Sequence, residues 1–175
     1  YRGGGFEGTA KSLRIENSEI ADNSANDATA AADPTRGGGM HIYNNAVNWQ
    51  GPGDRMGVKI INSTISGNAV SATGGAMVAS SNLALELINS TVSGNSATAG
   101  AGGIANGSGS TLQLSSVTIA FNAADSDGNN FGDGGGLANS ATAIVRNSLI
   151  GENVDASTSG TIFPDCSGGF TSDGY

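Results

Sequence analysis

The sequence is poor in cysteine and in charged residues, and each shortage excludes a class of protein. Cys166 is the single cysteine among 175 residues, so no disulfide can form within the chain and the redox compartment stays open. Only 7 residues are Lys or Arg, against 15 Asp or Glu, and the net charge is −8. Without a basic patch, the chain is a poor candidate for binding nucleic acid or an anionic membrane surface.

Long apolar runs are missing as well. No stretch approaches the roughly 20 apolar residues of a membrane-spanning helix, so we expect no transmembrane segment. The chain opens on YRGGGFEG, in which no signal peptide is visible. Charged residues make up 13% of the sequence, which is too few for a solvated, acidic, disordered chain.

A repeated polar phrase is what the sequence has in abundance. INSTISGN at residues 61–68 returns as INSTVSGN at residues 88–95, 27 residues later. A catalytic motif needs to occur once, whereas a phrase that recurs at a fixed interval describes architecture. Five versions are recognisable: NSEIADN from Asn17, NSTISGN from Asn62, NSTVSGN from Asn89, SVTIAFN from Ser116 and NSLIGEN from Asn147.

Each phrase follows a stretch in which apolar and polar residues alternate, and alternation predicts a half-buried strand. We therefore expect an all-β fold, a parallel β-helix of roughly five to six coils, with about 27 residues and about three short strands per coil. Equivalent side chains should stack in four inward columns: Phe6/Met40/Met77/Ile104/Leu137, Leu13/Val58/Leu85/Leu112/Ala143, Ile15/Ile60/Leu87/Leu114/Val145 and Ile20/Ile65/Val92/Ile119/Ile150. The longer intervals are explained by loop insertions at residues 24–36, 43–54 and 123–133.

The final Asn of the phrase predicts a second kind of column. Stacked Asn side chains can hydrogen-bond one another along the solenoid, and Asn tolerates left-handed backbone well, so we expect these residues to turn a corner of each coil. Glycine pairs upstream should allow positive φ and close approach of the backbone at other corners. The expected ladder is Asn23, Asn68, Asn95, Asn122 and Asn153.

Units such as INSTISGNAVSATGGAM and INSTVSGNSATAGAGGI resemble the right-handed parallel β-helix repeats of bacterial secreted and cell-surface proteins. These include polymorphic outer-membrane-protein-like repeats and extracellular proteins with a CSLREA motif, a motif that this chain does not contain. The resemblance covers residues 3–175 and implies a right-handed solenoid at the cell surface or outside the cell, without implying an activity. It also implies that Cys166 pairs with a cysteine beyond this chain.

The whole chain, residues 1–175, is expected to be one uncapped segment of a longer protein, because it begins inside a coil and stops without a capping element. Exposed strand edges of an uncapped solenoid invite pairing. We expect further coils or domains of the same protein, or end-to-end self-association, to cover them.

Two insertions contain candidate ligand sites. Trp49 lies near Tyr43, Asp54 and Arg55, where an exposed aromatic ring would offer a platform for a polysaccharide; alternatively, Trp49 folds back and pins its loop. DSDGNNFGD at residues 125–133 resembles the start of a calcium loop, although the same composition is ordinary for a turn. Calcium is the one cofactor that the sequence suggests, and its ligands would be Asp125, Asp127, Asn129 and Asp133.

Outward columns offer weaker candidates. Thr64, Thr91 and Thr118 form either a hydroxyl array for ice or a crystalline polysaccharide, or an ordinary solvated face. Arg14 and Lys59 share another outward column, and a polysaccharide lyase has a catalytic Arg or Lys on such a sheet face. Alternatively, the column is a stabilising charge ladder in which Lys59 pairs with Glu86. His41, which alternation places outward, has no identifiable triad partners, so we assign no catalytic residue.

Two hypotheses follow. The first is an extracellular or cell-surface structural and adhesive segment that contacts glycans or assembles into a fibre. The second is a carbohydrate-active, polysaccharide lyase-like enzyme whose catalytic coils lie partly outside this chain.

Overall fold

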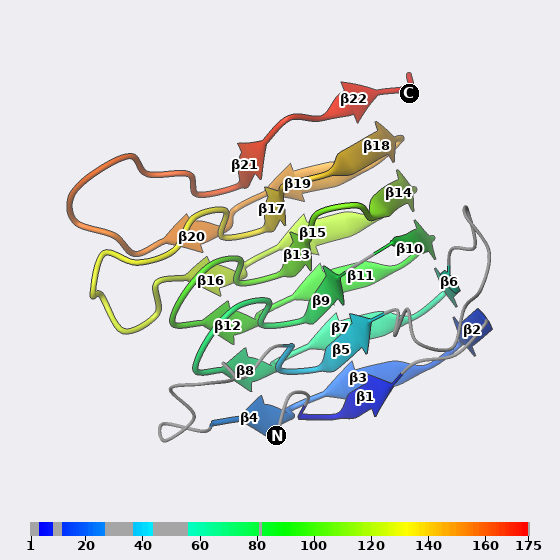
Figure 1. Cartoon of the computed structure of the whole chain (residues 1–175), viewed down its shortest axis with the longest axis horizontal. Coiled ribbons are helices and arrows are strands. Elements are labelled where there is room, and N and C mark those ends of the chain that lie inside the picture. The colour runs from blue at the N-terminus through cyan, green and yellow to red at the C-terminus, as the bar shows by residue number, and fades with distance from the viewer. Residues whose placement is uncertain (1–3, 9–11, 27–36, 44–55, 81, 175) are drawn as a thin grey trace.

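The computed structural model describes residues 4–8, 12–26, 37–43, 56–80 and 82–174, and it is a right-handed parallel β-helix (Figure 1). The described residues contain strands and no helix. Complete coils contribute one strand to each of four parallel sheets, here named A to D in chain order. The predicted fold class is therefore confirmed.

The sheets stack strands that lie one coil apart. Sheet A consists of β1 (Phe6–Gly8), β5 (Met40–Tyr43), β9 (Met77–Ser80), β13 (Ile104–Asn106), β17 (Leu137–Asn139) and β21 (Cys166–Gly168). Sheet B consists of β2 (Ser12–Glu16), β6 (Met56–Ile61), β10 (Leu83–Ile88), β14 (Thr111–Ser115), β18 (Thr142–Arg146) and β22 (Thr171–Ser172). Sheet C consists of β3 (Glu19–Ala21), β7 (Thr64–Ser66), β11 (Thr91–Ser93), β15 (Thr118–Ala120) and β19 (Leu149–Gly151). Sheet D consists of β4 (Ser24–Ala25), β8 (Ala69–Val70), β12 (Ser96–Ala97), β16 (Ala123–Ala124) and β20 (Val154–Asp155).

The number of strands per coil differs from the prediction, because sheet D was not foreseen. Its strands are two residues long, which is too short to show an alternating pattern. The first two residues of the predicted insertions 24–36 and 123–133 belong to this sheet, as β4 and β16.

The inward columns have the predicted register in all four cases. Ile65, Val92 and Ile119 are completely buried, whereas Ile20 and Ile150 at the ends of the same column are half-buried. In sheets B and C, partners lie 27 residues apart in the middle coils and 45 or 31 apart towards the ends. The core is a thin apolar stack that each coil shares with its neighbours.

Glycine allows the coils to stack closely where sheet D passes into sheet A. A Cβ atom on Gly75 would lie 2.1 Å from the carbonyl oxygen of Gly102. Gly74, just before it, has a φ of 76°, which is accessible to glycine at little cost. The predicted role of the glycine pairs in close approach is therefore confirmed.

The prediction for the final Asn was half wrong. Positive φ occurs at the first residue of each phrase (Asn17, Asn62, Asn89, Ser116, Asn147) and at the sixth (Asp22, Gly67, Gly94, Phe121, Glu152), and the final Asn does not have it. The sixth residue makes the backbone turn. The final Asn stabilises the corner through its side chain.

Candidate functional site

The predicted Asn ladder is present, and all its members except the half-buried Asn23 are buried. Each Asn donates its backbone N–H and its Nδ2–H to the Oδ1 atom of the Asn one coil later, at 2.8–3.1 Å. Asp165, which sequence reasoning missed, ends the ladder, because its Oδ1 accepts the same two hydrogen bonds from Asn153. These amides have partners inside the fold, so the ladder is a structural element rather than a ligand site.

The second residue of the phrase forms another ladder that the sequence did not reveal. The hydroxyl of Ser63 accepts a hydrogen bond from the backbone N–H of Ser18 and donates to the carbonyl of Ile61. Ser90 does the same one coil later, with Ser63 and Ile88 as its partners. The polar phrase therefore holds successive coils together at both ends of the sheet C strands.

Tyr43 is the one predicted glycan-contact residue that lies within the described residues. Trp49, Asp54 and Arg55 lie outside them, so the platform that they would form stays a prediction. Tyr43 ends β5, and its ring centroid lies 5.1 Å from that of His41, with 31° between the ring planes. His41 is on the outward column of sheet A but is only 3% exposed, because this face of the sheet is partly covered.

The predicted calcium loop is organised by hydrogen bonds among its own residues. The carboxylate of Asp125 is fully buried and accepts the backbone N–H groups of Asn129 and Asn130, at 2.8 and 3.0 Å. Asp127 accepts a hydrogen bond from the Asn129 side chain, while Asp133 is exposed. Groups of three or more His, Cys, Asp or Glu that could hold a metal ion do not occur among the described residues. Calcium binding stays a prediction.

The surroundings shift the pKa values of Asp125 and of the Cys166 thiol in opposite directions. Burial acts to raise the pKa of Asp125, but hydrogen bonds from Ser157 and from the loop backbone outweigh it and hold that pKa below the ordinary value. Burial, together with the adjacent Asp165 carboxylate, raises the pKa of the Cys166 thiol. Cys166 continues the inward column beyond Leu137, so a protonated, core-facing thiol is a poor nucleophile.

The outward face of sheet B carries the residues of the enzyme hypothesis. Arg14 and Lys59 are register partners and line a shallow depression of about 420 Å³ over Gly57 and Ala84. Lys59 forms an ion pair with Glu86 at 2.7 Å. Arg14 pairs with Glu16 at 3.0 Å, so both cations are occupied in a cross-strand or local charge pair.

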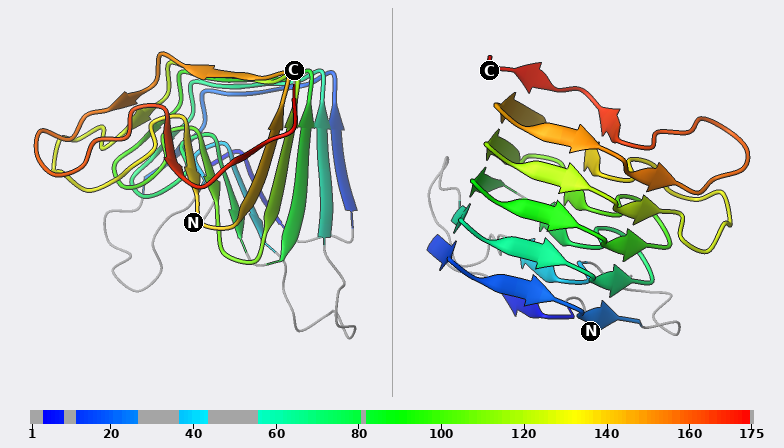
Figure 2. Two further views of the ribbon diagram at one scale, coloured as in Figure 1. Left: turned by 90° about the horizontal axis from the view of Figure 1, so that it is seen from above. Right: turned by 180° about the vertical axis from the view of Figure 1, so that it is seen from behind.

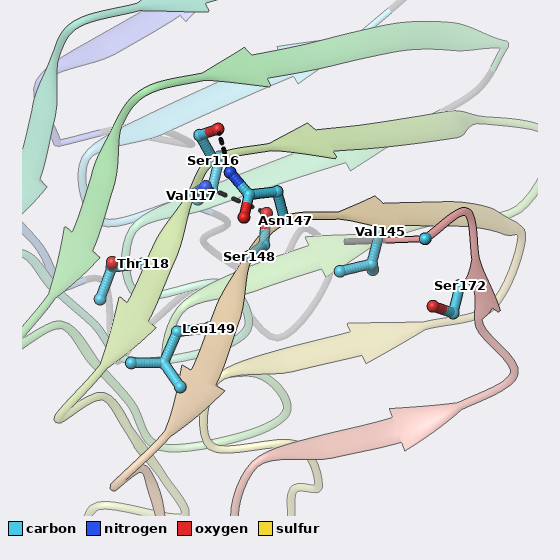
Figure 3. Close-up of a pocket in the computed structure, with 9 residues that line it drawn as sticks. Ser116, Val117, Thr118, Val145, Asn147, Ser148, Leu149 and Ser172 are labelled. Carbon is cyan, nitrogen blue, oxygen red and sulfur yellow. Dashed lines mark hydrogen bonds between the residues drawn. The ribbon is translucent and has the colours of Figure 1, made fainter.

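The threonine column on sheet C has the expected register. Thr64, Thr91 and Thr118 are direct partners, and the column ends in Glu19 on one side and Leu149 on the other. Leu149 also lines a pocket of about 570 Å³ at the corner between sheets B and C, beside β22 (Figure 3). The described residues of its walls carry hydroxyl, amide and aliphatic side chains, and none of these has a titratable side chain that could transfer a proton.

A groove on the outer face of sheet A is the site that sequence reasoning missed. It has a volume of about 320 Å³, and we call it the sheet A groove. Its floor contains Val78, Ala105 and Ala138, which are partners across β9, β13 and β17. Its walls include Thr73 and Ala101 from the connections between sheets D and A, and Ser80 and Ser140 at the ends of the strands. Viewed along the solenoid, these connections project from one side of the coils (Figure 2).

Large exposed apolar side chains gather in one part of the chain. Among the described residues these are Phe6 at the first strand and then Phe121, Phe131, Leu149, Val154, Ile162 and Phe163. The loops after β16 and β20 carry three of them, Phe131, Ile162 and Phe163, and project beyond the stack (Figure 1). They are linked to each other, because the Asn130 side chain accepts hydrogen bonds from the backbone of Thr158 and Ser159.

The described residues contain no helix that is long and apolar enough to span a membrane. Comparisons of the chain with protein-family models, with curated proteins and with solved structures found no match.

Proposed function

We propose that the chain is a structural and adhesive segment of a bacterial secreted or cell-surface protein, of the outer-membrane-repeat type, whose surface contacts glycans. The supporting observation is that each buried polar side chain of the repeated phrase forms a hydrogen bond that joins one coil to the next. A solenoid bonded in this way along its length resists bending and extension, as a surface spacer must.

The arrangement of the irregular regions supports the adhesive part. The strands supply a regular frame, and the exposed phenylalanines of the loops after β16 and β20 stand on its side. Loops on a rigid scaffold are where binding residues concentrate, and exposed apolar groups among polar ones mark contact surfaces.

A glycan array tests the proposal directly. The labelled chain should bind a restricted set of immobilised polysaccharides. The Phe131→Ser variant should bind all of these polysaccharides more weakly, or should retain binding to only some of them. Glu152→Ser, an exposed change at a corner of sheet C, is the matched control and should bind as the unaltered chain does. Absence of binding to every glycan and to bacterial and host cell surfaces would remove the adhesive part.

A polysaccharide lyase-like activity is the second candidate. It is favoured by the register of Arg14 and Lys59 above the depression on sheet B. Incubation with polyuronates should then release unsaturated products, and Lys59→Ala should abolish their ultraviolet absorbance. Intact polymer after prolonged incubation would leave the structural proposal alone.

End-to-end self-association belongs to the same proposal. Static light scattering against protein concentration should show a rising mean mass if the sheet edges pair between copies. A constant monomer mass would exclude it.

A further inference from the structure

We propose that the sheet A groove binds a neutral, linear polysaccharide whose chain lies along the solenoid axis. This inference rests on the proposed glycan contact and adds a second place of contact, with its ligand class, to the loops after β16 and β20.

The floor of the groove repeats with the coils. Val78, Ala105 and Ala138 are register partners, so each coil offers one small apolar side chain at the spacing of neighbouring strands, about 4.8 Å. Val78 and Ala105 are buried and belong to a cluster with Ala101 that is separate from the core inside the solenoid. A site that repeats along an axis suits a ligand that repeats along its length.

The walls of the groove supply hydroxyl groups on both sides. Thr73 comes from the connection between β8 and β9, which folds against the outer face of sheet A: a Cβ on Gly74 would lie 2.5 Å from Cγ2 of Val78. Ser80 and Ser140 follow the floor residues on β9 and after β17. An apolar floor with a few hydroxyl groups at its edges is the usual chemistry of a small-molecule site, and it matches a sugar, which has apolar C–H faces and a rim of hydroxyls.

Two neighbouring aromatic rings lie beside the groove on sheet A, one coil closer to the N-terminus. His41 is the register partner of Val78, and Tyr43 is the register partner of Ser80. A chain lying on the floor residues therefore reaches the half-buried Tyr43 ring, which has an apolar face and a polar hydroxyl for a sugar to contact.

Charge selects a neutral polymer over an acidic one. No Asp, Glu, Lys or Arg is among the described residues that line the groove. The whole chain carries a net charge of −8, so an anionic polymer would be repelled and would find no cation in the groove.

Calorimetric titration with soluble neutral oligosaccharides of increasing length, and with polygalacturonate, tests this. We expect neutral chains to bind with an affinity that rises with length and changes little with salt. Ala138→Leu, which fills the floor, should weaken binding roughly tenfold or more. Ala84→Leu makes the same substitution in the depression on sheet B and should leave binding unchanged.

NMR shifts of the unaltered chain provide a readout that does not depend on a variant's folding. Amides of residues 72–80, 99–107 and 138–140 should move on addition of the neutral oligosaccharide. The groove is not the binding site if a folded Ala138→Leu variant binds unchanged, or if Ala84→Leu weakens binding instead. The same conclusion follows if the NMR shifts are confined to other residues, or if only polygalacturonate binds and does so in a salt-sensitive way. Each of these four outcomes would leave the proposed glycan contact in place. Absence of binding to every glycan would remove both proposals together.

Discussion

The middle coils and the C-terminal coils are built from the same repeat but treat apolar side chains differently. In the described part of residues 56–120, the inward side chains of sheet C are completely buried and no large apolar residue is exposed. Between residues 121 and 163, Phe131 is 75% exposed and Phe121 68%, and the inward Ile150 is only half-buried. A rung of this solenoid is thus buried by its neighbours on both sides rather than by its own sequence.

The largest effect should come from crowding the backbone in the middle coils. Gly75→Ala would place a Cβ 2.1 Å from the Gly102 oxygen and 2.6 Å from the Ser96 nitrogen, and neither atom can move without displacing a coil. We expect a loss of more than about 4 kcal/mol in the free energy of unfolding, or no folded protein at all. Urea unfolding and the yield of folded protein measure it.

Gly151→Ala in the last strand of sheet C is the control. Its Cβ would meet no atom within 4 Å, so stability should change by less than about 0.5 kcal/mol. Equal losses in the two variants would show that glycine is not needed for close stacking.

Truncating isoleucine to alanine at two positions of the inward column of sheet C measures how much the neighbouring coils on both sides contribute to stability. Ile65→Ala leaves a cavity between completely buried partners and should cost about 4 kcal/mol. Ile20→Ala, in the first coil, removes the same atoms from a half-buried site and should cost less than half as much. Similar changes in the urea midpoint for both variants would contradict the view that burial comes from both sides.

The sequence predicted the parts of the fold that repeat. Alternation identified the inward columns and their register, because one misplaced residue would have turned a whole strand inside out. It did not reveal sheet D, whose strands are too short for a pattern, or Asp165, which lies 12 residues after Asn153 and so off the repeat. The sheet A groove was missed because its walls come from connections whose path the repeat does not specify.

The Asn ladder allows the middle coils to be compared with the end of the solenoid in the same way, with a smaller expected loss of stability. Asn95→Ala removes the acceptor of two Asn68 donors and the donor to Ile65, all in buried surroundings, and should cost about 3 kcal/mol. Asn23→Ala removes only a half-buried terminal donor and should cost about 1 kcal/mol. Chemical unfolding compares the two, and an equal cost would mean that the ladder contributes by its shape rather than by satisfying buried groups.

The smallest expected effect is a gain in stability rather than a loss, from replacing Phe121 by glycine. Phe121 has a φ of 59° at the position where the middle coils have Gly67 and Gly94. Phe121→Gly relieves a left-handed backbone that is unfavourable for an L-residue, and this gain exceeds the extra entropy of glycine in the unfolded chain. We expect stabilisation of about 0.5 kcal/mol, because the exposed ring contributes little burial.

Ala123→Gly, two residues on and in a β-strand, should instead destabilise by about 0.5–1 kcal/mol, since its backbone gains nothing from glycine. Thermal and urea unfolding of the pair decide the matter. If Phe121→Gly is destabilised as much as Ala123→Gly, the phenylalanine ring packs on its corner strongly enough to offset the strained backbone. The exposed residues of the C-terminal coils would then belong to the frame of the solenoid and not to its contact surface.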